Sequence, residues 1–392
     1  MKKNNISGFI SPFIFLALAI CIIIYPKTAF TSSLDGLNLW YSTVCPALLP
    51  FFICVEILIG LGVINLIGDV FQPIMNFLFN IPGEGAFAFI MSIASGYPVG
   101  AKVIADLRKK DICTKIECQR MINLCSTSGP LFVIGAVSIG MLKNSYIAST
   151  LLFSHYLSAI SMGFLMRFYK RDIKSRKVYR RHPFTAFSKR IKENTKPLGQ
   201  VLADSIVNSI NLILMVGGYI IIFSVFSGII LQTGLLSIIA DPINMLLPKT
   251  KIRSDIFAAF FIGILEVTNG VKASAPLGIP YIAKLALVSF FIGFGGISIN
   301  AQVIGLIHDT DIDFSLYLFI KIFQGIIASF YSILFFHFSI FVPVFSDNTL
   351  KPFSNSLLPS YVFKISIAFL TASLFFFTLS VLLKITSKES SM

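Results

Sequence analysis

The sequence predicts an all-α polytopic membrane protein, an inverted repeat of about eight transmembrane helices and two re-entrant helical hairpins. Two observations carry this prediction. The 392-residue chain is 55% hydrophobic and only 13% charged, whereas a soluble domain carries about 25% charged residues. Two hydrophobic stretches also carry matching interruptions, SIASGYPVGAK at residues 92–102 and GILEVTNGVKA at residues 263–273. Such paired interruptions in two halves of a chain are typical of transporters with inverted repeats.

The first half of the chain is expected to hold four spans, one interfacial helix and one hairpin. A helix needs about 20 apolar residues to cross a bilayer, and Lys and Arg at its ends set its direction. The hairpin begins and ends on the cytoplasmic side, because it is followed by Arg108-Lys109-Lys110. The predicted order is spans 8–25 and 40–61, interfacial helix 63–79, hairpin 85–107 with its tip at 95–98, and spans 121–142 and 145–168.

The second half is expected to repeat this order upside down, with both termini inside. Residues 205–231 cross outward, 235–247 form an interfacial helix, 255–283 form a hairpin from outside with its tip at 266–270, and 284–307, 315–342 and 361–384 are spans. This reading divides the chain into residues 1–39 (first helix and external loop), 40–168 (repeat 1), 169–204 (basic cytoplasmic loop), 205–308 (inverted repeat 2) and 309–392 (C-terminal helices).

Positive charge is concentrated between residues 167 and 197. Twelve Lys or Arg stand there against Asp172 and Glu193, so this segment holds +10 (12 − 2) of the net charge of +14. The positive-inside rule makes it a cytoplasmic loop near anionic lipid; the alternative, nucleic-acid binding, has no other support, and no nucleic-acid partner is expected. Lys2-Lys3 followed by an apolar run reads as a retained first helix, with a cleaved signal peptide as the alternative.

The sequence offers few signs of catalysis or metal binding. The six cysteines show no CxxC spacing, the four histidines are scattered, and no HExxH, GxSxG or Walker A motif occurs. We therefore expect no enzyme, no catalytic residue, no metal site and no ATP as direct driver. Asp309, Asp311 and Asp313 alternate in a short turn, which is a solvated turn or, alternatively, a cation site.

Four interruptions of the apolar spans carry the candidate binding residues, because irregular backbone at membrane depth survives only when buried or lining a cavity. The second members of the two pairs are STSGP at 126–130 and GFGGISIN at 293–300. The candidates are Ser95, Gly96, Tyr97, Gly100 and Lys102; Asn123, Ser126, Thr127, Ser128 and Gly129; Glu266, Thr268, Asn269 and Lys272; and Ser298, Asn300 and Gln302.

These residue types suit a small anion. A broken helix directs unpaired N–H groups and the positive end of its dipole into a cavity, and Lys102 and Lys272, one from each repeat, would flank a dianion. Glu266 would pair with a lysine, bind Na⁺ or carry a proton; Na⁺ or H⁺ as coupling ion is the only cofactor considered. The alternatives stay open: single serines as packing contacts, lysines that extend to the interface, and Glu56 as a second intramembrane acid or a structural one.

Three segments carry a resemblance to a known family: SGYPVGAKVIADL at 95–107, ECQRMINLCSTSGPLFVIG at 117–135 and GFGGISINAQV at 293–303. They resemble the sporulation integral membrane proteins of the YlbJ type (stage V sporulation protein VV), in the nucleoside-recognition or Gate domain group. The resemblance covers roughly residues 8–384. It implies an endospore former, a protein made in the mother cell and placed in the outer forespore membrane, and movement of dipicolinate towards the spore.

A transporter of a small organic anion, with dipicolinate as the solute that the resemblance implies, is therefore the expected function. Dipicolinate is a planar aromatic dianion, and Tyr97 would stack on its ring. Three rivals stand beside it: a non-transporting assembly protein of the spore envelope, a transporter of nucleoside-like solutes and, with least support, an intramembrane enzyme. The expected partners are the solute, the bilayer and other spore-envelope membrane proteins. The sequence leaves the coupling ion, the direction of flux and the oligomeric state open.

Overall fold

The computed structural model describes residues 6–61, 63–170, 172, 197–236, 238 and 254–338, and the elements assigned there are helices. Five helical stretches in this part of the chain are long and apolar enough to cross a membrane: Pro26–Leu58, Ser145–Met166, Leu198–Gln232, Tyr281–Ile307 and Phe314–His337. The pair Pro73–Phe79 and Gly83–Ser95, bent by 93°, would add a sixth if it formed one span instead of a re-entrant turn. The all-helical membrane fold is thus confirmed. The last expected span, 361–384, and most of 235–247 lie outside the described residues, so the count of eight and the inverted repeat stay predictions.

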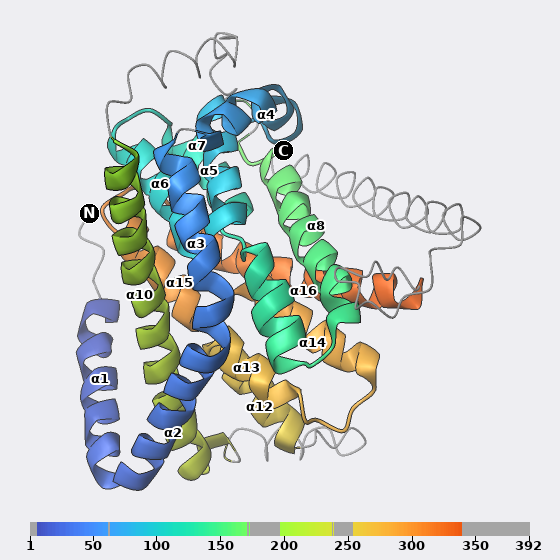
Figure 1. Ribbon diagram of the computed structural model, residues 1–392. Helices are drawn as coiled ribbons and strands as arrows, with labels where there is room; N and C mark the ends of the chain where they lie inside the picture. Colours follow the sequence, from blue (N-terminus) through green and yellow to red (C-terminus); the bar gives the residue numbers. More distant parts are fainter. Residues whose placement is uncertain are drawn as a thin grey trace.

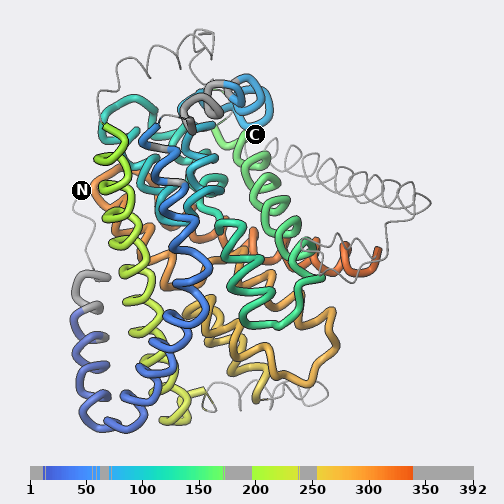
Figure 2. Tube along the Cα trace, viewed as in Figure 1, coloured from blue at the N-terminus to red at the C-terminus, as the bar shows by residue number. Residues whose placement is uncertain are grey.

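Helices α1, α2 and α3 form an outer layer with the long helix α10, and α4 lies apart from it beside α5, Gly83–Ser95 (Figure 1). Pro12 lies inside α1 and Pro50 inside α3, and a π-helical turn, η1, joins α2 to α3. Their bounds are α1 Ile6–Ile24, α2 Pro26–Leu39, η1 Trp40–Val44, α3 Cys45–Gly60, α4 Val63–Phe79 and α10 Leu198–Gln232. Figure 2 follows α10 from one end of the molecule to the other, beside α3.

Residues 26–39 correct the expectation of an external loop, because they form helix α2. The segment is polar for a membrane helix, which is why it reads as a loop in the sequence. Small residues let this helix lie close to α10. A Cβ on Gly36 would come 2.6 Å from Ser224 Oγ, and one on Gly228 would come 1.9 Å from Ser32 Oγ. Close approach through small residues is a common way for membrane helices to pack.

The first interrupted region consists of α5 Gly83–Ser95, α6 Tyr97–Lys109, α7 Lys115–Leu124, the π-helix η2 Phe132–Met141, η3 Ser145–Ile147 and α8 Ala148–Met166. Helices α5 and α6 form a hairpin, since a Cβ on Gly100 would lie 2.7 Å from Ser92 Cβ, on the other side of the turn at Gly96. Helix α7 starts with a capping box between Thr114 and Glu117. The expected hairpin at 85–107 and the expected break at 126–130 are both present.

The second interrupted region consists of α12 Ser254–Leu265, α13 Val267–Ser274, α14 Tyr281–Phe294, α15 Gly296–Ile307 and α16 Phe314–His337. Helices α12 and α13 form the second hairpin, because a Cβ on Gly270 would lie 2.1 Å from Gly263 Cα. Helix α14 ends at Gly295, whose φ of +86° is left-handed, and α15 starts directly after it. The expected second hairpin and second broken span are thus present.

The two hairpins open at opposite ends of α8. Next to the first hairpin, Arg120 donates hydrogen bonds to the carbonyl oxygens of Asn80 at 3.0 Å and Lys170 at 2.9 Å, which joins the start of α5 to the chain that leaves α8. Next to the second hairpin, Asn144, just before α8, donates to the Tyr281 hydroxyl at 2.9 Å. The hairpin tips therefore approach the middle of the molecule from opposite sides (Figure 1).

Candidate functional site

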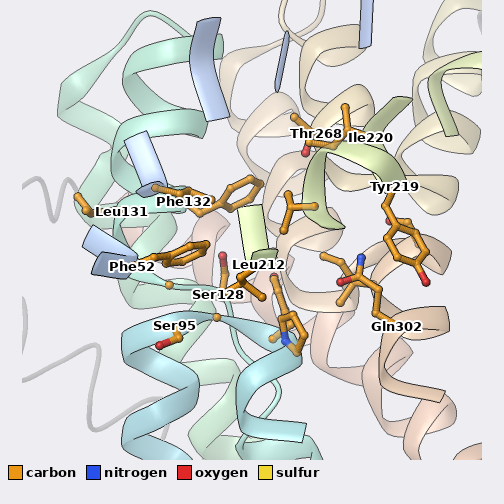
Figure 3. Close-up of a pocket in the computed structure, with 18 of the residues that line it drawn as sticks. Phe52, Ser95, Ser128, Leu131, Phe132, Leu212, Tyr219, Ile220, Thr268 and Gln302 are labelled. Carbon is orange, nitrogen blue, oxygen red and sulfur yellow. The ribbon is translucent and has the colours of Figure 1, made fainter. Parts of the chain in front are cut away.

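All four interruptions meet at one cavity of about 700 Å³, a volume that includes its open mouth. Helices α3 and α10 close its remaining sides with apolar and aromatic side chains. Figure 3 shows Ser95 and Ser128 near Phe52 and Phe132 on one side, with Thr268, Tyr219 and Gln302 across from them. The lining residues are Leu48, Phe51 and Phe52; Ala94, Ser95, Gly96, Tyr97 and Pro98; Ser128, Gly129, Leu131 and Phe132; Leu212, Val216, Tyr219 and Ile220; and Glu266, Thr268, Ser298, Ile299 and Gln302.

The first hairpin tip is fixed to the unwound segment 125–129. Gly96 adopts φ +85°, a conformation that glycine tolerates and that ends α5. Gly100 leaves room for the backbone of Cys125, because a Cβ there would lie 1.9 Å from the Cys125 carbonyl oxygen. The Ser92 hydroxyl accepts a hydrogen bond from the Thr127 N–H at 2.8 Å and pairs with the Thr127 hydroxyl at 2.7 Å. Tip and unwound segment therefore form one surface of the cavity.

The second hairpin tip turns at Glu266, which is buried. Its carboxylate accepts from the Asn269 N–H at 2.7 Å and so caps the N-terminus of α13. The Asn269 side-chain oxygen accepts from the Ser224 hydroxyl of α10 at 3.1 Å. Gly296 brings α15 against this tip, since a Cβ on it would lie 3.3 Å from Glu266 Cα. Asn300 steadies the break by donating to the Gly296 carbonyl oxygen at 2.6 Å.

A buried polar network lies on the far side of the unwound segment, and sequence reasoning missed most of it. The Lys321 ammonium of α16 donates to the Ser126 carbonyl oxygen at 3.0 Å and to the Gln324 side-chain oxygen at 2.9 Å. The Ser126 hydroxyl pairs with the Tyr317 hydroxyl at 2.9 Å. The lysine and the glutamine inside the apolar span 315–342 could have indicated this network from the sequence. Ionisable groups within membrane spans are costly and usually functional.

Histidine and tyrosine from α8 complete this network. His155 Nε2 accepts from the Ser128 N–H at 2.8 Å, and the Tyr156 hydroxyl donates to the Ser128 carbonyl oxygen at 2.8 Å. The Tyr97 hydroxyl donates to the Ile292 carbonyl oxygen in α14, which joins the first hairpin to the second broken span. The backbone of the unwound segment is thus held by side chains rather than by a helical ladder, as a stable break at membrane depth requires.

Two comparisons with known proteins bear on the site. A family model described as nucleoside recognition, named Gate, matches residues 41–170, a range that includes the first hairpin and the first unwound segment. The sporulation integral membrane protein YlbJ of Bacillus subtilis (strain 168) is 34% identical over 340 residues, which cover 84% of this chain and 83% of that protein. The chain belongs to the YlbJ family. The resemblance stated from the three sequence segments is thereby confirmed.

The structure of this family member brings most of the predicted binding residues together. Nine of them line the cavity: Ser95, Gly96, Tyr97, Ser128, Gly129, Glu266, Thr268, Ser298 and Gln302. Six more are buried or close-packed groups that shape the four breaks: Gly100, Asn123, Ser126, Thr127, Asn269 and Asn300. The pocket walls on α3 and α10 were not among the predicted residues, because nothing in an unbroken apolar helix marks the face that borders a cavity.

Lys102 and Lys272 are the two candidates that lie elsewhere. Both are exposed, and neither lines the cavity. The nearest charge to Lys272 is Asp35, whose Oδ1 lies 3.9 Å from the Lys272 Nζ. The structure therefore does not place the two lysines on either side of a solute, as the sequence interpretation assumed. Glu56 accepts from Asn208 Nδ2 at 3.3 Å, which is consistent with the structural alternative for that acid.

The chemistry of the cavity combines aromatic walls with helix N-termini. Helices α6, α13 and α15 start at lining residues or directly beside them, and η2 starts at Phe132. The positive ends of these helix dipoles therefore lie at this region, and that of α13 is capped by the Glu266 carboxylate. Among the described residues no group hydrogen-bonds to the buried Ser95 hydroxyl, so a bound solute would satisfy it. Glu266 is the acidic side chain among the lining residues.

The turn between α15 and α16 is joined by ion pairs to the end of α6. Arg108 Nε lies 2.7 Å from Asp311 Oδ1, and Lys109 Nζ lies 3.2 Å from Asp309 Oδ2. The hydrogen bond from Arg108 lowers the pKa of Asp311, and hydrogen bonds from His308 and Lys109 lower the pKa of Asp309. In the described residues no group of three or more His, Cys, Asp or Glu side chains is placed to hold a metal ion.

Proposed function

We propose that this chain is a sporulation membrane transporter that moves a small organic anion, with dipicolinate as the candidate solute. The observation that carries the proposal is the meeting of two opposed hairpins and two broken spans at one cavity. Broken helices near the middle of a membrane protein are the usual place for a transporter's solute site. The relative's name connects that protein to sporulation, and the proposed localisation is the outer forespore membrane.

The shape and chemistry of the cavity support a planar aromatic anion. Phe51, Phe52, Phe132 and Tyr219 offer flat apolar surfaces, on which an aromatic ring stacks. Helix N-termini favour carboxylates by about 0.3–1 kcal/mol each when exposed and by more when partly buried. Because Lys102 and Lys272 lie outside the cavity, we assign binding of the carboxylates to the helix N-termini and the Ser95 hydroxyl instead.

A nucleoside-like solute is the second candidate, favoured by the Gate match over residues 41–170. A nucleobase would stack on the same aromatic walls, and Glu266 and Gln302 offer hydrogen-bonding groups for a base edge or a ribose. The two solutes differ in charge, because dipicolinate is a dianion at neutral pH and a nucleoside is neutral.

Equilibrium binding separates these proposals. The purified full-length chain in detergent is titrated with radiolabelled dipicolinate, alone and in the presence of excess adenosine or uridine. We expect saturable dipicolinate binding that nucleosides do not displace, and at least about tenfold weaker binding in Gln302→Leu. Displacement by nucleosides would favour the second candidate. No binding of either solute to correctly folded protein would support the rival interpretation, an assembly protein of the spore envelope.

A further inference from the structure

Lys321 is a fully buried lysine in the middle of α16 that the proposed function does not use. Its side chain is 0% exposed, and its ammonium donates to a backbone carbonyl of the unwound segment and to the Gln324 side chain. Within the described part of the chain, no carboxylate forms an ion pair with it. A buried charge without a counter-ion is expensive, so a role that offsets this cost is to be expected.

Tyr97 connects this cation to the cavity. The Lys321 Nζ lies 5.3 Å from the centroid of the Tyr97 ring, and Tyr97 is among the residues that line the cavity. The ammonium is therefore separated from a solute in the cavity by one aromatic side chain. Lys321, Gln324 and Tyr317 are 0% exposed, so bulk solvent screens the field of the ammonium only weakly.

The hydrogen-bond partners of Lys321 are the groups that elsewhere hold an inorganic cation. Unwound backbone carbonyls at a broken helix coordinate Na⁺ in many transporters, and such sites are completed by side-chain oxygens. Here the Ser126 carbonyl oxygen lies in the unwound segment after α7. The Lys321 ammonium donates both to this oxygen and to the Gln324 amide oxygen. A tethered ammonium therefore occupies the position where a free cation would otherwise bind.

We propose that Lys321 is the fixed cation of the solute site. It supplies the positive charge that favours an anionic solute in the cavity, and it takes the place of a coupling Na⁺. This inference rests on the proposed function, since it assigns the residue that selects for charge at that cavity. On this proposal the site takes an anion although Glu266 is its acidic lining residue and Lys102 and Lys272 lie elsewhere.

The test compares two probes of the same shape and different charge, dipicolinate and the neutral pyridine-2,6-dimethanol. Their affinities for the full chain are measured in sodium buffer and in choline buffer. Lys321→Met removes the charge and keeps the length of the side chain, and Lys321→Arg keeps the charge. Gln324→Glu keeps the lysine and places a carboxylate where the amide oxygen is now 2.9 Å from Nζ. The matched controls are Lys110→Met and Gln232→Glu, both at exposed positions.

We expect the wild-type chain to bind dipicolinate equally well with and without Na⁺. Lys321→Met should weaken dipicolinate binding by about tenfold or more and binding of the neutral probe by less than about twofold. Lys321→Arg and both controls should keep the wild-type preference. Gln324→Glu should reproduce the selective loss with the lysine still present, so the test holds even where Lys321→Met fails to fold.

Three results would overturn the inference. Equal losses for both probes would show a structural role for Lys321, and an unchanged preference in Gln324→Glu would show that its charge is not felt in the cavity. A wild-type affinity for dipicolinate that depends on Na⁺ would show that a free cation is still needed. Absence of wild-type binding to either probe is a different outcome, because it contradicts the proposed function itself.

Discussion

Two glycines determine how closely the helices of each hairpin approach. Gly100 faces the Cys125 carbonyl and Ser92, and Gly270 faces the backbone of Gly263. A methyl group on Gly100 would lie 1.9 Å from the Cys125 carbonyl oxygen, and one on Gly270 would lie 2.1 Å from Gly263 Cα. These are backbone atoms, which do not move aside as a flexible side chain does. Each hairpin therefore depends on one position at which a side chain is excluded.

Alanine at these glycines should destabilise the protein. We expect Gly100→Ala and Gly270→Ala to lower stability by about 1–3 kcal/mol, the usual cost of overpacking, and to lower the midpoint of thermal unfolding in detergent. Gly218→Ala and Gly305→Ala are matched controls, because a Cβ there meets no atom within 4 Å. An unchanged midpoint in Gly100→Ala and Gly270→Ala would show that the hairpins are not packed as described.

The structure places some of the predicted site residues at the cavity and others away from it. Ser95 and Thr268 lie at helix breaks, so the breaks themselves led to them. Lys102 was placed at the solute although it shares an exposed face of α6 with Asp106, while Ala101 and Ala105 are buried. The 3.6-residue period of a helix already predicts that Lys102 and Asp106 share one face. Lys321 was missed because the residues that it contacts, Ser126 and Tyr97, are distant from it in sequence.

At the scale of elements, the opposite openings of the two hairpins can be tested by labelling. The first hairpin ends beside the start of the basic segment and the second ends near Asn144 at the other end of α8. In a background without native cysteines, Lys110→Cys should react with an impermeant maleimide from the cytoplasmic side and Gly278→Cys from the other side. Both positions are exposed. Labelling of both from one side would contradict the arrangement.

The ion pairs between α6 and the α15–α16 turn give stability a defined dependence on pH. Because Arg108 lowers the pKa of Asp311 below its ordinary value of 3.8, this pair stabilises the fold above that value. The contribution is lost as the pH falls through the lowered pKa. The side chains are partly exposed, so we expect only about 0.2–1 kcal/mol.

Thermal unfolding at pH 6 and at pH 3 measures this contribution. At pH 6, Asp311→Asn should unfold at a lower midpoint than the wild type. At pH 3, the difference between the two midpoints should be smaller. Asp106→Asn, on the exposed face of α6, is the control and should follow the wild type at both values. An Asp311→Asn midpoint that matches the wild type at pH 6 would show that the turn is not held by this pair.

Over the whole molecule, apolar runs and their interruptions predicted most of the fold. The breaks at Gly96, Glu266 and Gly295 appear where glycine or a polar cluster interrupts an apolar stretch, because only an unusual local sequence gives up helical hydrogen bonds in a membrane. Helix α2 and the cavity walls on α3 and α10 were not predicted, since they arise from packing between distant segments. The inverted repeat itself stays a prediction.

The claim that the four breaks form a transport site is tested most directly by uptake of radiolabelled dipicolinate into proteoliposomes. The wild-type chain is compared with Glu266→Gln and Gln302→Leu, which change the cavity, and with the double variant Lys102→Gln/Lys272→Gln, which changes two exposed lysines. We predict saturable uptake that falls at least about tenfold in the cavity variants and is kept in the lysine variant. Uptake that is lost in the lysine variant and kept in the cavity variants would contradict the assignment of the site.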